Sequence, residues 1–206
     1  MKKPWIVALA LALGLLAGCS SESSKPAEKP QPKPPEYSTA RFAFQKLYVA
    51  AHGWARDAQP FRVESQLTSD CKGQDGKSAV WRAGFASALQ RSVKPYIWSG
   101  TNAADAPARG ISPGSEDTYN ANNSSTQIFD INFLKVDSDD ALDVAQKHGG
   151  AKVMEKAPDT PIQYVLDWDR SQNKLIWHIF YGPSRQEAKL SVAVDATTGD
   201  FLRVEK

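Results

Sequence analysis

Residues 162–181 read Ile-Gln-Tyr-Val-Leu-Asp-Trp-Asp-Arg-Ser-Gln-Asn-Lys-Leu-Ile-Trp-His-Ile-Phe-Tyr. Large apolar residues occupy every second position over 162–168 and again over 175–181. This period of two is typical of β-strands. The polar segment 169–173 lies between the two runs and predicts a turn. The stretch therefore predicts an antiparallel hairpin, and the rest of the fold can be built outward from it.

A helix is expected before this hairpin and a second hairpin after it. We expect the helix to start at Asp137 or Ser138 and to end at Gly149-Gly150, because apolar residues repeat at helical spacing between these points. Acidic residues in its first turn and basic residues in its last turn also favour a helix. Strands at 190–194 and 201–204, joined by a tight turn, complete this part of the chain.

An earlier part of the chain shows the same order of elements. A helix is predicted from Ser38 to His52-Gly53, where the glycine suits a left-handed cap. Alternating patterns then predict strands at 61–67, 79–85 and 93–99. The third of these strands contains a proline, which suits only an edge strand or a bulge.

Landmarks in the two parts recur at one offset. Trp81 and Trp177 are 96 residues apart, and so are the His-Gly pairs that end the two expected helices. The repeat indicates an internal duplication, with coincidence among aromatic-rich strands as the alternative. We therefore predict an α+β fold of two similar units, 38–136 and 137–206, each with a helix packed on an antiparallel sheet.

Two segments between the units are harder to assign. Residues 100–125 are rich in Gly, Asn, Asp, Ser and Ala and are long for a connection, so we expect a functional or disordered loop. Phe129, Ile131 and Phe133 alternate with other residues, and we expect them to add a strand to the first sheet.

The N-terminal residues 1–18 have the organisation of an export signal. Lys2 and Lys3 precede a run of roughly a dozen apolar residues, too short for the about 20 that span a bilayer. The closing Leu16-Ala17-Gly18-Cys19 resembles the lipobox of bacterial lipoproteins. That resemblance implies cleavage before Cys19 and a lipid on its sulfur, with the membrane as a partner. Ser20, in place of the Asp of the family's inner-membrane sorting pattern, favours the outer membrane, facing the periplasm.

Residues 19–37 follow as the lipidated cysteine and a linker. The segment holds five prolines and no apolar period, so we expect a disordered, extended stalk. The alternative is a proline-rich peptide that docks in an aromatic groove.

Composition excludes some classes of function. The formal net charge of +2 falls to 0 when Lys2 and Lys3 are removed with the signal. A balanced domain gives no electrostatic reason to expect nucleic acid as a partner. Cys71 is then the one thiol left, in a polar turn, and it is either a reactive or intermolecular thiol or an incidental loop cysteine.

Residues 138–206 resemble a PepSY domain, a module named for peptidase propeptides. The resemblance rests on 141–150, on the strand 175–181 and above all on 191–202, where a strand leads into Asp195-Ala196-Thr197-Thr198-Gly199 and a short final strand. The first unit lacks this ending. The resemblance implies a tandem pair of small cystatin-like modules that bind an envelope protein or peptide, and a role in modulating a peptidase.

No catalytic or metal-binding constellation emerges from the sequence. The three histidines are far apart, no Gly-x-Ser-x-Gly elbow occurs, and no cofactor is indicated. The apolar strand with Trp177, His178 and Tyr181 is either a covered central strand or a partner-binding patch, with His178 expected to be exposed at least in part. We expect a non-catalytic binding protein. The rival is a small-ligand binder or hydrolase with a pocket on a curved sheet, covered by 100–125 as a lid.

Overall fold

The computed structural model describes residues 33–205, and Pro34 to the C-terminus form a single unit. The signal predicted at 1–18, Cys19 and most of the linker predicted at 19–37 lie outside the described residues. Within 33–205 the fold is α+β, as predicted. No helix of this part is both long and apolar enough to cross a membrane.

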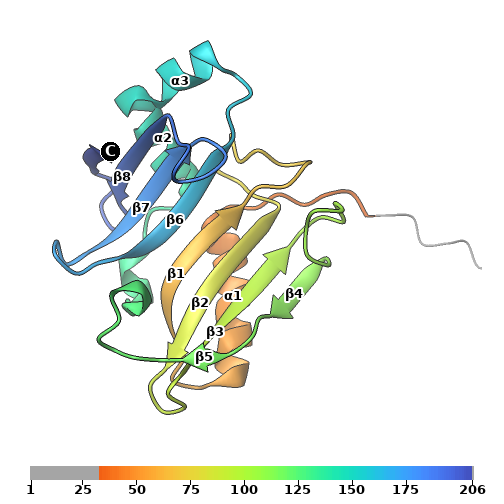
Figure 1. Ribbon diagram of the computed structural model, residues 1–206, viewed down its shortest axis with the longest axis vertical. Coiled ribbons are helices and arrows are strands. Elements are labelled where there is room, and N and C mark those ends of the chain that lie inside the picture. The colour runs from red at the N-terminus through yellow and green to blue at the C-terminus, as the bar shows by residue number, and fades with distance from the viewer. Residues whose placement is uncertain (1–32, 206) are drawn as a thin grey trace, which may run out of the picture. The chain divides into compact units, whose positions relative to one another are not determined.

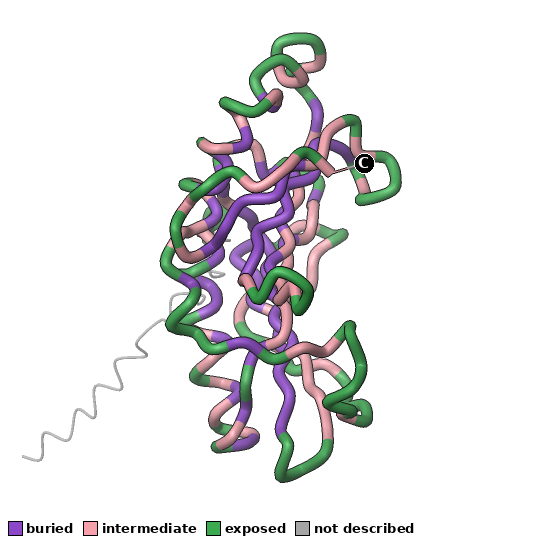
Figure 2. The backbone as a smooth tube through the Cα atoms, turned by 90° about the vertical axis from the view of Figure 1, so that its left-hand side faces the viewer, coloured by how far each residue is buried: buried purple, intermediate pink, exposed green. Residues whose placement is uncertain are grey.

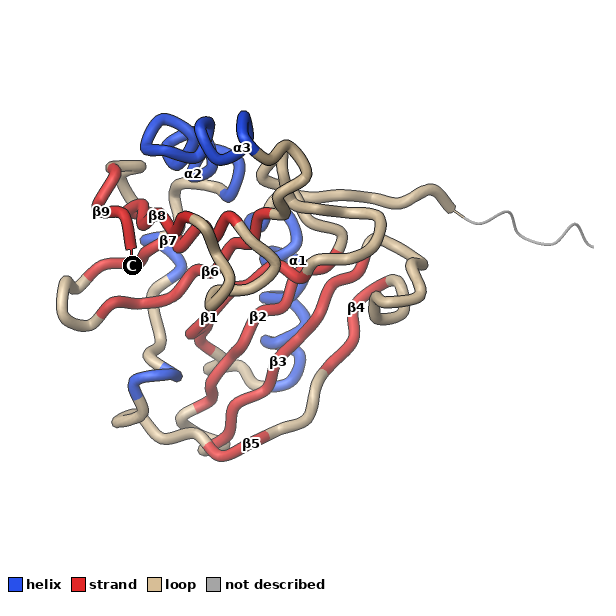
Figure 3. The backbone as a smooth tube through the Cα atoms, turned by 45° about the horizontal axis from the view of Figure 1, so that its top comes forward, coloured by secondary structure: helices blue, strands red, loops and turns tan. Residues whose placement is uncertain are grey.

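The strands of the described residues form one antiparallel sheet. They are β1 (Gln59–Gln66), β2 (Val80–Ser87), β3 (Ser92–Ser99), β4 (Gly110–Pro113), β5 (Asp117–Thr118), β6 (Ile162–Asp169), β7 (Lys174–Tyr181), β8 (Leu190–Asp195) and β9 (Phe201–Glu205). Their order is β4-β3-β2-β1-β6-β7-β8-β9, with β5 also beside β3 (Figure 3). Every strand expected over 61–99 and 162–204 is present.

The helices pack on one face of this sheet. They are α1 (Ala40–Trp54), α2 (Ser138–Ala145) and α3 (Ala151–Lys156), with short turns η1 (Ser124–Thr126), η2 (Ile131–Phe133) and η3 (Gln146–Gly150). α1 lies against β1, β2 and β3, and α2 lies against β7 and β8 (Figure 1). One hydrophobic core runs under both helices. The opposite side of the sheet carries no α-helix within residues 33–205 and is called the open face below.

Burial follows this layering. Figure 2 shows the buried backbone concentrated in the strands and in the sides of the helices that face them, with the turns exposed. β7 is buried at every position from Leu175 to Tyr181. It is a central strand that is covered on both faces. Of the two alternatives given for this strand from its sequence, a covered central strand or a partner-binding patch, the structure therefore shows the first.

The first of the two helices does not end as expected, whereas the second breaks at the expected glycine and then continues. Gly53 lies inside α1, and the chain leaves that helix at Ala55 in an extended conformation with φ −142°, so the predicted glycine cap is wrong. In the second helical region Gly149 does take a left-handed φ of 113°, which breaks the helix where expected. The chain then resumes as α3, which the sequence pattern did not predict.

The segment between the halves also differs. Ile131 and Phe133 lie in the turn η2, and Phe129 lies outside any strand, so the predicted extra strand is wrong. Asp130 competes with strand pairing, because its carboxylate accepts a hydrogen bond from the Asn132 backbone N–H.

The expected loop 100–125 contributes strands of its own. β4 and β5 both pair with β3, so β3 is not the edge strand that its proline seemed to require. Pro95 is tolerated because it lies opposite the break between β4 and β5. There its carbonyl accepts from Gly114 N–H at 2.8 Å, and no donor is needed from the proline.

The two halves join at β1 and β6 and use the same local device. The indole N–H of Trp81 donates to the Ser38 carbonyl at 2.9 Å, and that of Trp177 donates to the Val136 carbonyl at 3.0 Å. Each acceptor lies two residues before the helix of its own half. The equivalence fits the predicted duplication, which stays a prediction.

Asp137 and Ser138 tie the N-termini of both helices together. The Asp137 carboxylate accepts from the backbone N–H of Ser138 at 2.8 Å and from that of Arg41 at 2.9 Å. The Ser138 hydroxyl accepts from Ala40 N–H at 2.9 Å and donates to the Gly76 carbonyl at 2.6 Å. Asp137 is therefore an N-cap, as its sequence context predicted, and it caps a second helix as well.

The end of the predicted linker is bonded to the body. Glu36 N–H donates to the Gly100 carbonyl at 2.9 Å, and the Tyr37 hydroxyl donates to the Asp70 carbonyl at 2.7 Å. The Arg109 guanidinium donates to the carbonyls of Pro34 and Gly100. Residues 34–37 thus belong to the folded unit, and the linker boundary moves back accordingly.

Candidate functional site

The side chains predicted to bind a partner lie on β7, between β6 and β8. Trp177 and Tyr181 are fully buried and belong to the core under the helices. They offer no surface to a partner, which corrects the prediction for these two residues. His178 points to the open face but is only 7% exposed, so the expectation of an exposed histidine is wrong too.

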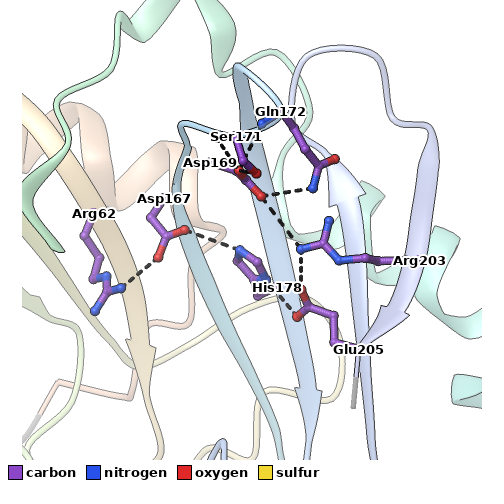
Figure 4. A network of polar contacts seen from close by, with 8 residues as sticks. All are labelled: Arg62, Asp167, Asp169, Ser171, Gln172, His178, Arg203 and Glu205. Carbon is purple, nitrogen blue, oxygen red and sulfur yellow. Dashed lines mark hydrogen bonds and ion pairs between the residues drawn. The ribbon is translucent and has the colours of Figure 1, made fainter. Parts of the chain in front are cut away.

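His178 is held between two carboxylates (Figure 4). Its Nε2 lies 3.3 Å from Oδ1 of Asp167 on β6, and its Nδ1 lies 2.8 Å from Oε2 of Glu205 on β9. β8 separates β7 from β9, and the residue of β8 between His178 and Arg203 is Ala193. Because the Ala193 side chain is short, the imidazole and the Glu205 carboxylate can meet above β8.

These contacts set the ionisation of the three groups. Burial alone would lower the pKa of His178, but hydrogen bonds and attraction from Asp167 and Glu205 outweigh it and raise the pKa to about 9. Burial would likewise raise the pKa of each carboxyl, but the hydrogen bond and charge of His178 outweigh it and lower both pKa values. At neutral pH the trio is an imidazolium between two carboxylates.

Further ion pairs extend the trio in both directions. Nη2 of Arg62 on β1 lies 2.7 Å from Oδ2 of Asp167, and this ion pair links the two halves of the sheet across the β1–β6 junction. Nη2 of Arg203 on β9 lies 2.8 Å from Oε1 of Glu205 and 3.9 Å from Oδ2 of Asp169. We call these residues the charge network: Arg62, Asp167, Asp169, His178, Arg203 and Glu205. Its cations and anions alternate across the open face.

The turn after β6 anchors the outer end of the network. The Asp169 carboxylate accepts from the Ser171 hydroxyl at 2.5 Å and from the Gln172 side-chain amide at 2.9 Å (Figure 4). Backbone N–H groups of the same two residues donate to it as well, at 2.9 and 3.1 Å. This is the local turn chemistry expected of Asp, Ser and Gln after a strand, and it lowers the pKa of Asp169 despite its partial burial.

The arrangement does not equip His178 for base catalysis. A general base needs a free ring nitrogen next to the proton that it removes. Both ring nitrogens of His178 are already bonded to carboxylates, and within residues 33–205 these are its only bonded partners. The nucleophile–base pair of acyl-transfer sites is therefore not formed here. The cations and anions of the charge network neutralise one another, and the network forms the floor of the pockets described next.

Two pockets open above this floor. The first, of about 320 Å³, is lined by every member of the charge network except Arg62, together with Arg170 and Arg185, and we call it the His178 pocket. The second, of about 360 Å³, is lined by Phe180, Lys189 and their neighbours, and we call it the Phe180 pocket. Arg185 and Glu205 line both, so the two pockets are adjacent. Ser124 of η1, at the end of the expected lid 100–125, borders the His178 pocket.

A larger pocket of about 400 Å³ lies on the first half of the open face, between β1–β3 and residues 115–117. Glu64 pairs with Arg82 at 2.9 Å, and Glu116 pairs with the nearby Lys94 at 3.0 Å, whereas Asp117 has no ion pair within residues 33–205. This pocket carries no histidine, and its chemistry is less distinctive than that of the His178 pocket.

The remaining candidates have structural roles. The Cys71 thiol is 8% exposed and lies 3.8 Å from the Lys77 carbonyl, and burial raises its pKa, which makes it a poor nucleophile. His148 stacks on Phe201 with ring centroids 3.8 Å apart. His52 lies 3.1 Å from the Arg56 carbonyl through Nδ1. Among residues 33–205 no group of three or more potential ligands is placed to hold a metal ion.

The acidic partners of His178 were not identified from the sequence. A signal was nevertheless present, because Asp167 and His178 both occupy open-face positions of predicted neighbouring strands. Glu205 could not be placed in this way, since its approach depends on two further strand pairings.

Comparison with known proteins gives a fold and no family. No protein-family model matches the chain, and no curated protein matches it either. The structure is similar to the crystal structure of a putative lipoprotein from Clostridium difficile 630, with a TM-score of 0.52 and 12% sequence identity. The similarity covers 79% of this chain and 91% of the other. The two chains share an α+β fold of the same general arrangement.

Proposed function

We propose that this chain is a lipid-anchored protein of the bacterial cell envelope that binds a protein or peptide without catalysing a reaction. The anchor would be lipid on Cys19, after cleavage of residues 1–18. The support is Leu16-Ala17-Gly18-Cys19 after a short apolar run. The likeness to a chain described as a putative lipoprotein is consistent with the same kind of anchor.

The observation that carries the non-catalytic half of the proposal is the state of His178. It is the histidine best placed for chemistry, on the open face beside two pockets, and both its ring nitrogens are occupied by carboxylates. A floor of paired charges can orient a bound chain, whereas it cannot accept a proton from one. The PepSY resemblance of 138–206 supports a protein or peptide partner, including an envelope peptidase, and the serine after Cys19 supports the outer membrane.

Mass spectrometry of the protein extracted from membranes with detergent tests the anchor. We expect a mature N-terminus at Cys19 that carries fatty acyl chains. Cys19→Ala should abolish the acyl mass and release the protein from the membrane fraction, whereas the matched control Cys71→Ala should change neither. An intact Met1 without fatty acid on the wild-type protein would refute the proposal.

An array of random 12-residue peptides tests the binding half. We expect saturable binding to a subset of the peptides by the detergent-purified protein. Turnover of bound peptides, or binding to none of them, would contradict a non-catalytic peptide-binding role.

A further inference from the structure

The open face of the second half holds cations that the protein leaves without a carboxylate partner. The adjacent His178 and Phe180 pockets are lined by five cationic residues and three acidic ones, a net charge of +2 with His178 protonated. The cations are Arg170, His178, Arg185, Lys189 and Arg203, and the acids are Asp167, Asp169 and Glu205. The surplus is concentrated at one place on a chain whose formal net charge, with histidines neutral, is +2, and 0 without Lys2 and Lys3.

The acids of these pockets are already bonded. Asp167 pairs with Arg62 and His178, while Glu205 pairs with His178 and Arg203. Asp169 accepts four hydrogen bonds from the turn that follows it. The acids thus form their ion pairs and hydrogen bonds within the floor, and among the rim cations only the charge of Arg185 also contributes to the lowered pKa of Glu205.

The cations of the rim are different. Arg170, Arg185 and Lys189 are exposed, and no ion pair within residues 33–205 involves them. The Arg185 guanidinium lies 5.4 Å from the centroid of the Phe180 ring, which holds it between the two pockets. Arginine held in this way presents its N–H groups to a carboxylate at a low cost in side-chain entropy.

We propose that the two adjacent pockets together bind an acidic peptide segment, with Arg170, Arg185 and Lys189 as the residues that contact its carboxylates. The proposal rests on the proposed peptide-binding function and names the class of its ligand. Arg170 lines only the His178 pocket and Lys189 only the Phe180 pocket. A ligand must therefore extend through both pockets to meet all three cations, which an extended chain does and a single small anion does not.

The position of the cations favours a peptide over an anionic membrane surface. They lie around recessed pockets whose walls include Asp169 and Glu205. A flat layer of lipid phosphates would meet those carboxylates together with the arginines. A chain that lies across the pockets can place its acidic side chains at the rim cations, away from the acids of the floor.

Fluorescence anisotropy with labelled peptides tests the inference on the full protein purified in detergent. The probes are hexaglutamate, hexaglutamine and hexalysine peptides of the same length and label. We expect hexaglutamate to bind at least about tenfold more tightly than hexaglutamine, with an affinity that falls as salt rises, and hexalysine to bind most weakly. Each rim cation should contribute about twofold to fivefold.

Charge-neutral variants locate the effect. The triple variant Arg170→Gln, Arg185→Gln, Lys189→Gln should lose about tenfold or more in hexaglutamate affinity. The matched control Lys152→Gln removes one exposed cation of α3 and should change nothing. Because all four residues are exposed, circular dichroism should show each variant folded as the wild type is.

Several results would overturn the inference. One is equal affinity for the three peptides, or a triple variant that behaves as the wild type does. The inference would also fail if inorganic phosphate displaced labelled hexaglutamate as well as unlabelled hexaglutamate does. It would fail too if vesicles of anionic phospholipid retained the protein while hexaglutamate did not bind it. The proposed function has a test of its own, because it would be refuted if the protein bound no peptide of the random array. Binding of neutral array peptides with indifference to charge would refute the inference and leave the proposed function standing.

Discussion

Raising the pH should weaken folding through His178, and the size of the effect follows from the charge network. The pKa of His178 is raised from an ordinary value of 6.5 to about 9 in the folded protein. A raised pKa means that the folded state holds this proton more tightly than the unfolded chain does. The stabilisation is therefore complete below pH 6.5 and is lost as the pH rises toward 9.

Each pH unit in this window is worth about 1.4 kcal/mol of unfolding free energy. Between about pH 6 and pH 8.5 we expect a loss of about 2–3 kcal/mol, a large part of the about 5–15 kcal/mol typical of a domain. Stopping near pH 8.5 keeps most of the titration of the Cys71 thiol, whose pKa is raised by burial, out of the measurement. On the acid side the lowered pKa values of Asp167 and Glu205 predict a second loss of stability as the pH falls below about 4.

Urea unfolding at a series of pH values, followed by tryptophan fluorescence, measures this directly. His178→Gln should be less stable than the wild type at pH 6 and should show a flat profile up to pH 8.5. Glu205→Gln, which removes one of the two carboxylates, should keep roughly half of the slope. A wild-type unfolding free energy that stays constant within about 0.5 kcal/mol, or an unchanged slope in His178→Gln, would refute the account of the charge network.

Three further expectations concern the scaffold. Asp137→Ala should lower the free energy of unfolding in urea by about 2 kcal/mol, because it uncaps two helices. The control Asp140→Ala should lower it by less than about 1 kcal/mol. Equal losses in the two variants would argue against the shared cap. Tyr181→Phe should leave the stability unchanged or raise it by up to about 1 kcal/mol, because the buried Tyr181 hydroxyl has no hydrogen-bond partner among the described residues; a clear loss would indicate a partner. The Cys71 thiol should react with iodoacetamide at least about tenfold more slowly in native protein than in urea, and equal rates would mean that the thiol is accessible.

Much of the secondary structure could be predicted because it depends on near neighbours. The alternation over 162–168 and 175–181 predicted β6 and β7. Asp137 ahead of an acidic first turn predicted the start of α2. The failures were also local in cause: Asp130 bonds its own turn and prevents the predicted strand at 129–133, and Gly53 sits in a helix that continues past it.

The candidate site could be predicted only in part. Period-two alternation placed His178 on the face opposite Trp177, but it could not show that this face is nearly closed to solvent. Burial there depends on neighbours brought by β6 and β9, and Glu205 reaches His178 only because β9 pairs with β8 and Ala193 is small. Such contacts span up to 27 residues of sequence and three strands, and no local pattern encodes them.

The sequence by itself determined the α+β class, the strands over 59–99 and 162–205, the cap at Asp137 and the motif at Cys19. These follow from side chains within a few positions of one another, whose spacing decides between helix, strand and turn. Only the tertiary structure decided that β1 pairs with β6, so that the strands of both halves form one sheet. That pairing brings Arg62 to Asp167, and the pairing of β7, β8 and β9 brings His178 to Glu205. The physical reason is that the register between distant strands is set by burying one shared core, and the charges of the open face are placed as its consequence.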